Sequence, residues 1–137
     1  MITRYREEAM EIEVTFPGGK RVDAKVGAFT IHTDQPVEAG GAGSATGPFE
    51  LFLASLATCA GYYALAFCQG RSLPTEGLGL TLRYAADGAG IPTQVLLELR
   101  LPFGFPEGHR AAMLRAVGHC KVKRTVAAAP SIEVALV

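Results

Sequence analysis

The stretch from Pro48 to Gly70 limits what this chain can fold into more than any other part of the sequence. Between Leu51 and Cys68 it carries no charged residue, and almost all of its side chains are apolar. Pro48 suits the first turn of a helix, where its missing N–H costs nothing, and Glu50 places a negative charge at the same end. A glycine such as Gly70 is a typical helix stop. We therefore expect one helix of about 30 Å over this stretch.

A helix that is apolar on every side either spans a membrane or is buried all round. The length of this one just reaches the spanning range. Tyr62 and Tyr63 lie in the middle of the stretch rather than at its ends, and the flanking sequence alternates like soluble strands. We therefore expect a soluble protein without a membrane partner. A chain of 137 residues has trouble covering such a helix alone, so we expect an obligate homodimer whose central helices pack together.

The composition is that of one soluble globular domain over residues 1–137. Hydrophobic residues make up 49% and charged residues 19%, and 13 basic residues balance 13 acidic ones. Because the net charge is zero, the sequence gives no support for nucleic acid as a partner. The N-terminal residues are charged and lack an apolar core, so we expect no signal peptide. Three cysteines in an unexported chain indicate a reducing compartment, and we expect a cytoplasmic protein.

Polar and apolar residues alternate in six short stretches, which predicts strands. These stretches are residues 11–16, 21–26, 28–33, 78–84, 93–101 and 132–137. Residues 106–117 have the pattern of an amphipathic helix, and residues 120–126 that of a further helical turn or two. The resulting order, β3-α-β2-α-β, predicts an α+β fold with the sheet on one side and the helices on the other.

A glycine-rich loop over residues 34–47 leads into the central helix. Gly40, Gly41 and Gly43 have the backbone freedom that an anion-binding nest needs. The pattern is not that of a phosphate-binding P-loop, however, and no strand of the right kind precedes it. We therefore favour a flexible approach to the helix over a phosphate site.

The three cysteines carry the candidate chemistry. Cys59 and Cys68 are nine residues apart on the predicted helix, so they face opposite sides and cannot form a disulfide with each other. We expect Cys68 to be a small core residue. Cys120 follows His119 and precedes three basic residues, and such cationic surroundings favour a thiolate. Neither a CxxC nor an HxxxH spacing is present, so we expect no metal site.

The residues around the start of the predicted helix and around Cys59 resemble the signature of a known protein family. Pro48-Phe-Glu-Leu-Phe52, followed by Ala54 and Ala57-Thr-Cys59, resembles the signature of the OsmC/Ohr proteins, the osmotically inducible and organic hydroperoxide resistance proteins. The glycine-rich loop and Cys120-Lys-Val with Arg124 fit the same pattern. The resemblance extends over nearly the whole chain, including the order of its elements. It implies an OsmC-like subunit in an intertwined homodimer, with the sites at the subunit interface.

The resemblance also implies a thiol peroxidase that uses no haem, flavin or metal. Cys59 would be the peroxidatic cysteine, whose thiolate attacks an organic hydroperoxide and becomes a sulfenic acid. Cys120 would be the resolving cysteine, which converts the sulfenic acid to a disulfide. A small external dithiol would then regenerate both thiols. The apolar surroundings of the helix would suit an organic peroxide better than hydrogen peroxide.

The sequence departs from the family at the position after the proline. The family peroxidases have a glutamate there, which orients an arginine beside the reactive thiolate, whereas this chain has Phe49. Glu50 matches the next position, about 100° further round the helix. Arg21 is the candidate for the arginine, with Lys20 in reserve. An alternative is therefore a non-catalytic or sensor-type protein that binds a small apolar ligand at the dimer interface, and a third is a different thiol-dependent reaction.

Overall fold

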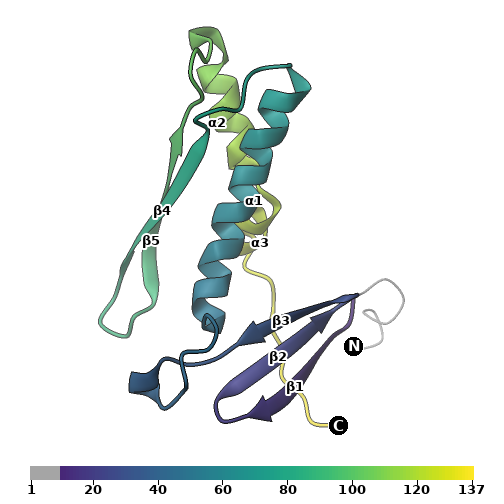
Figure 1. Cartoon of the computed structure of the whole chain (residues 1–137). Coiled ribbons are helices and arrows are strands. Elements are labelled where there is room, and N and C mark those ends of the chain that lie inside the picture. The colour runs from purple at the N-terminus through teal and green to yellow at the C-terminus, as the bar shows by residue number, and fades with distance from the viewer. Residues whose placement is uncertain (1–9) are drawn as a thin grey trace. The chain divides into compact units, whose positions relative to one another are not determined.

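The computed structural model describes residues 10–137, which belong to two compact units. The first unit ends at Leu51 and the second begins at Phe52, so the boundary falls just after the first turn of the longest helix. Figure 1 labels the helices and strands of both units. Together they make the mixed α+β fold that the sequence predicts.

The first unit is a three-stranded antiparallel meander. β1 (Ile12–Gly18), β2 (Arg21–Val26) and β3 (Phe29–Thr33) are neighbours in chain order, which confirms the three strands predicted before the helix. Gly19 and Gly27 in the two turns have φ of 57° and 58°, a left-handed conformation that glycine adopts without strain. Every residue of β1 is exposed, so this sheet buries little apolar surface within its own unit.

The longest helix, α1 (Pro48–Gly70), has the bounds that the sequence predicts. In the described part of the chain its buried residues lie on one face, formed by Leu56, Ala60, Ala64, Phe67 and Cys68. Large apolar side chains elsewhere on the helix are exposed, with Tyr62 at 63%. By length and composition alone, α1 could also cross a membrane, since its mean hydropathy is 1.7. The helix predicted to be buried all round is thus covered on one face within the chain, and the homodimer stays a prediction.

The second unit adds a hairpin of β4 (Gly79–Ala86) and β5 (Pro92–Arg100), as predicted from the two alternating stretches. In its antiparallel register Leu80 lies opposite Leu99, and Leu82 lies opposite Leu97. Leu80, Leu97 and Leu99 are partly buried against the helices. The hairpin therefore turns an apolar face towards α1.

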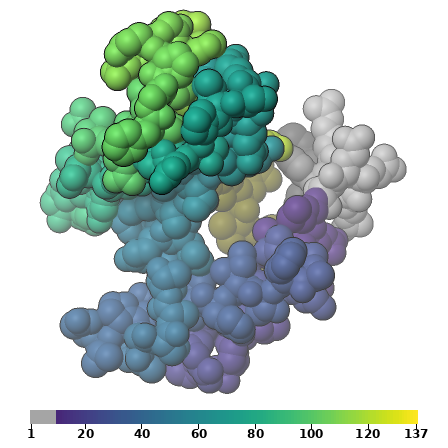
Figure 2. All heavy atoms as spheres, turned by 45° about the horizontal axis from the view of Figure 1, so that its top comes forward, coloured from purple at the N-terminus to yellow at the C-terminus, as the bar shows by residue number. Residues whose placement is uncertain are grey.

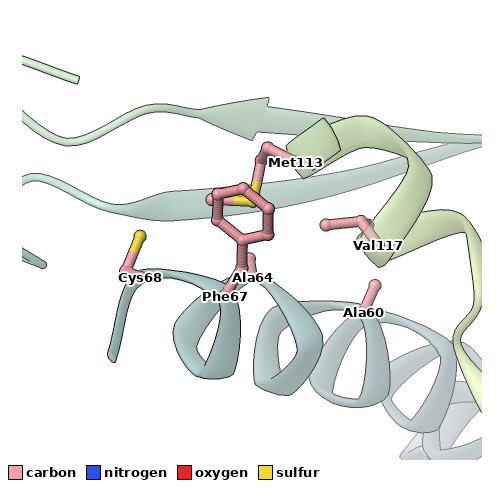
Figure 3. Packing of buried hydrophobic residues seen from close by; sticks show 6 residues of the cluster. All are labelled: Ala60, Ala64, Phe67, Cys68, Met113 and Val117. Atoms are coloured by element: carbon pink, nitrogen blue, oxygen red, sulfur yellow. The ribbon is translucent and has the colours of Figure 1, made fainter. Parts of the chain in front are cut away.

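The core of the second unit lies between α1, the hairpin and α2 (Arg110–Gly118). Figure 3 shows the Met113 side chain against the Phe67 ring, with Val117 on the side of Ala60. In Figure 2 α2, in green, packs beside the C-terminal end of α1, in teal. Met113 and Val117 of α2 pack in one cluster with Ala60 and Ala64 of α1, and this packing positions the segment that follows α2.

The helix predicted over residues 106–117 starts later than the sequence suggests. Its beginning is a tighter 3-10 turn, η3 (Glu107–His109), and the α-helical part begins at Arg110. A second short helix, α3 (Lys121–Ala127), confirms the further helical turns predicted in the basic segment. Short 3-10 turns are common at the start of α-helices, so this correction concerns the boundary and not the element.

The prediction of a last strand over residues 132–137 is wrong. These residues form no strand, and Ile132, Val134 and Leu136 are each more than four-fifths exposed. A strand needs a neighbouring edge for its backbone hydrogen bonds, and neither described sheet includes this segment. Local alternation alone does not supply that neighbour.

Candidate active site at Cys59 and Cys120

Two cysteines that are far apart in the sequence meet in the second unit. Cys59 lies near the middle of α1 and is half-buried, whereas Cys120 is fully buried and precedes the first residue of α3. The packing of α2 on α1 brings the start of α3 close to Cys59, so that Cys59 and Cys120 each shift the pKa of the other thiol. Both cysteines are free thiols. The residues predicted to be peroxidatic and resolving therefore lie close together.

The surroundings of Cys59 favour its thiolate. Burial by itself raises the pKa of this thiol, but hydrogen bonds and charge outweigh burial and hold the pKa below its ordinary value. The hydrogen bond from Cys120 comes first among them, followed by the backbone N–H groups of Val122 and Lys121 and then by the positive charge of Arg124. A thiolate stabilised in this way is a nucleophile at a lower pH than an ordinary cysteine.

The first turn of α3 fixes the position of Arg124. The Nε of Arg124 donates a hydrogen bond to the carbonyl oxygen of His119 at 3.0 Å, and its backbone N–H donates to the carbonyl oxygen of Cys120 at 3.0 Å. Sequence reasoning associated Arg124 with Cys120 and missed its effect on Cys59. The sequence did contain a signal for the backbone donors. A helix that begins just after Cys120 has N–H groups in its first turn without partners inside the helix, and these can stabilise a nearby thiolate.

The prediction that Cys120 itself is a thiolate is wrong. Burial first, and then the hydrogen bond to Cys59, raise the pKa of Cys120, although the backbone N–H groups of Lys123 and Val122 act in the opposite direction. The basic side chains that suggested a thiolate do not reverse this, since Lys121 and Lys123 are exposed to water, which screens their charge. The pair thus has one thiol that ionises readily and one that keeps its proton.

Cys68 is confirmed as a core residue. It is fully buried, and burial raises the pKa of its thiol. Figure 3 shows its sulfur directed towards the hairpin. Among residues 10–137, no group of three His, Cys, Asp or Glu side chains lies close enough together to hold a metal ion.

Arg21 and Glu50 belong to the first unit, whereas Cys59 belongs to the second. Arg21 begins β2 and, with Lys20, lines a cleft of the first unit. Glu50 lies in the first turn of α1, with its carboxylate close to Gly47. In the described part of the chain, no ion pair joins Arg21 to Glu50. Their predicted part in activating Cys59 stays a prediction.

Comparisons with known proteins agree on the family and the fold. The family model for OsmC-like proteins matches residues 41–135, a segment that includes both Cys59 and Cys120. A protein of Psychrobacter arcticus assigned to the osmotic stress and detoxification response shares the fold with a TM-score of 0.74 and 19% identity, over 88% of this chain and 90% of that chain. The organic hydroperoxide resistance protein OsmC of Legionella pneumophila has a TM-score of 0.56 and 18% identity, over 88% and 90% of the two chains.

A third structure has a ligand. It is a Vibrio cholerae protein assigned to organic hydroperoxide resistance, with captopril bound in one of its active sites, a TM-score of 0.54 and 20% identity over 88% of this chain and 87% of that chain. Identities this low show a shared fold alone, and no curated protein sequence matches the chain. The family model nevertheless covers well over half of the residues, and the neighbours confirm the predicted OsmC-like fold. The chain therefore belongs to the OsmC-like protein family.

Proposed function

We propose that this protein is a cysteine-based organic hydroperoxide reductase. The observation that carries the proposal is the pairing of Cys59, whose pKa is lowered, with the buried Cys120, whose pKa is raised. A two-cysteine peroxidase needs a thiolate that attacks the peroxide and a second thiol close enough to resolve the product. The names of two fold neighbours refer to organic hydroperoxide resistance, which supports this class of substrate.

The proposed reaction has three steps. The Cys59 thiolate attacks the terminal oxygen of the hydroperoxide, so that an S–O bond forms, the O–O bond breaks and the alkoxide takes up a proton to leave as an alcohol. The Cys120 sulfur then attacks the resulting sulfenic acid, an S–S bond forms, and the released hydroxide leaves as water with the proton of Cys120. An external dithiol reduces this disulfide by exchange and is itself oxidised to a disulfide.

The groups that activate Cys59 come from the same segment as the resolving cysteine. The N–H groups of Lys121 and Val122 and the charge of Arg124 follow Cys120 directly in the sequence. The segment that stabilises the thiolate therefore also carries the thiol that would resolve the sulfenic acid.

The proposal includes a homodimer in a reducing compartment, such as the cytoplasm, without a bound cofactor. Exposed apolar side chains of α1, among them Phe52 and Leu65, offer surface for a second subunit and for an organic peroxide. Captopril in an active site of the Vibrio cholerae neighbour is itself a thiol, which supports a small thiol compound as reductant. Arg21 and Glu50 keep their predicted role as additional activators of Cys59.

The test begins with fully reduced protein and one equivalent of cumene hydroperoxide, with hydrogen peroxide in a parallel reaction. Loss of thiols is followed by stopped flow, and the disulfide is mapped by digestion and mass spectrometry. We expect a bond between Cys59 and Cys120 that forms faster with the organic peroxide. Oxidation no faster than that of a small free thiol would contradict the proposal.

A second function is favoured by two observations. Phe49 stands where the family peroxidases have a glutamate, and Arg21 makes no ion pair with Glu50 in the described residues. A protein of this kind would bind a small apolar ligand at the dimer interface, with Cys59 as a slow sensor. Persistent free thiols after peroxide treatment, together with saturable binding of an apolar ligand, would favour this function over the peroxidase.

A further inference from the structure

A cleft of about 460 Å³ opens in the first unit, between the β1–β2 turn and the glycine-rich loop. Four glycines line it, together with Lys20 and Arg21 from the turn and Asp34, Ala42 and Ser44 from the loop. Its volume lies within the range of about 300–1,000 Å³ that is typical of small-molecule sites. The thiol chemistry proposed above takes Arg21 as an additional activator but uses no group of the loop, so it leaves the rest of the cleft without a function.

The loop side of the cleft is built around a buried carboxylate. Asp34 is 1% exposed and accepts hydrogen bonds from the N–H groups of Gln35, Ala42 and Ser44 and from the Ser44 hydroxyl. The bonds from Ser44 contribute most, and the pKa of Asp34 is lowered to about 2. This carboxylate is therefore ionised at neutral pH, and its acceptor positions are occupied by the protein itself.

The glycine-rich loop thus forms its hydrogen bonds with the protein's own Asp34 carboxylate. The N–H groups of Gly40, Gly41 and Gly43 are also used, since they donate to carbonyl oxygens of residues 35–37. A side chain at Gly41 would collide with the carbonyl oxygen of Gln35, so this close approach requires a glycine. The loop predicted to be flexible is instead held by hydrogen bonds, and its N–H groups are not free for an external phosphate.

The side chains that remain free in the cleft are positively charged. Lys20 extends along Gly40, where a Cβ would lie 3.6 Å from its Cε, and the Arg21 guanidinium lies beside Gly18. Within residues 10–137, neither cation forms an ion pair, and Asp34 is already engaged by the loop. Both cations line the cleft, so an anion bound there is attracted by two positive charges.

We infer that this cleft binds a small hydrophilic oxyanion, with Lys20 and Arg21 as its ligands. The planar guanidinium of Arg21 matches a carboxylate or phosphate with two parallel hydrogen bonds, and the Lys20 ammonium adds a point charge. The lining contains no aromatic or large aliphatic side chain, so it offers no surface to an acyl chain or a stacked base. The occupant is therefore a carboxylate or phosphate on a polar body. The peroxidase proposal also uses Arg21, but the binding test below is read without peroxide, so the two proposals can fail separately.

The test is a titration of the full-length, reduced protein, followed by backbone amide NMR at constant ionic strength. Inorganic phosphate, acetate and octanoate are the three probes. We expect phosphate or acetate to shift the amides of residues 18–21 and 40–44 in a saturable way. Arg21→Gln and Lys20→Gln each remove a charged hydrogen-bond donor, so each should weaken binding about tenfold.

Lys25→Gln is the matched control, because it removes the same charge from β2 outside the cleft. We expect it to bind like the unchanged protein. Tighter binding of phosphate supports a phosphate ligand, and tighter binding of acetate supports a carboxylate ligand. Octanoate binding far more tightly than acetate would overturn the hydrophilic assignment. The inference is also overturned if no probe gives saturable shifts, or if Arg21→Gln binds as Lys25→Gln does.

Discussion

The contact between Cys59 and Cys120 depends on how firmly α2 packs against α1, and Met113 is the side chain that tests this. It is fully buried and lies against the Phe67 ring. Met113→Ala removes three heavy atoms, and at about 0.8 kcal/mol for each buried methylene-sized group the transfer term is roughly 2.4 kcal/mol. A cavity of about 200 Å³ already borders Met113 beside Leu99, so the truncation enlarges an existing hollow. We therefore expect the free energy of unfolding to fall by about 3–5 kcal/mol.

The assay is urea unfolding of the reduced protein at one fixed concentration, because the proposed homodimer would make stability depend on concentration. Met113→Leu nearly conserves volume and should cost less than about 1.5 kcal/mol. Arg115→Gln, on the exposed side of α2, should cost less than about 0.5 kcal/mol. Formation of the disulfide should also slow in Met113→Ala, since a looser α2 holds the two thiols together less of the time. If Met113→Ala costs no more than Arg115→Gln, the packing argument is refuted.

Three further predictions concern charge and redox state. Arg124→Gln should raise the pKa of Cys59, measured as the pH midpoint of its alkylation, whereas Arg115→Gln should leave that midpoint unchanged. Cys120→Ser should leave an oxidised Cys59 that advances to sulfinic acid under excess peroxide, detected by intact mass, and turnover equal to that of the unchanged protein would contradict a resolving role. Asp34 has its pKa lowered from 3.8 to about 2, so it stabilises the fold above pH 4 and loses this effect as the pH falls towards 2. Asp34→Asn should remove that part of the pH dependence of unfolding. If the variant loses stability at low pH just as the unchanged protein does, the role of Asp34 is contradicted.

The sequence predicted the elements whose signal is local. The helix Pro48–Gly70 has its predicted bounds because a long uncharged run lies between a proline and a glycine. The strands before it and the hairpin after it follow from alternation and turn residues. The predicted strand over residues 132–137 failed because pairing depends on a neighbour, which alternation does not reveal. The late start of the helix at Arg110 has a local cause as well, since the preceding residues form a 3-10 turn.

The site was less accessible to sequence reasoning. That Cys59 and Cys120 act on each other followed only from the family resemblance, because no spacing rule connects residues so far apart. The basic segment after Cys120 pointed to a thiolate at the wrong cysteine. Burial raises the pKa of both thiols, and the hydrogen bonds and charge that outweigh it at Cys59 depend on packing in the second unit that the local pattern does not contain.

The placement of the activating groups bears on the missing glutamate. If an arginine oriented by a glutamate were the only source of thiolate stabilisation, Phe49 would mark a lost activity. In this chain the N–H groups of Lys121 and Val122 and the charge of Arg124 already lower the pKa of Cys59. Each belongs to the segment that also carries Cys120, so activation and resolution can persist together without the glutamate. On this argument Arg124→Gln should impair thiolate formation in this protein even if Glu50→Gln does not, and the reverse result would assign activation to the family's usual pair.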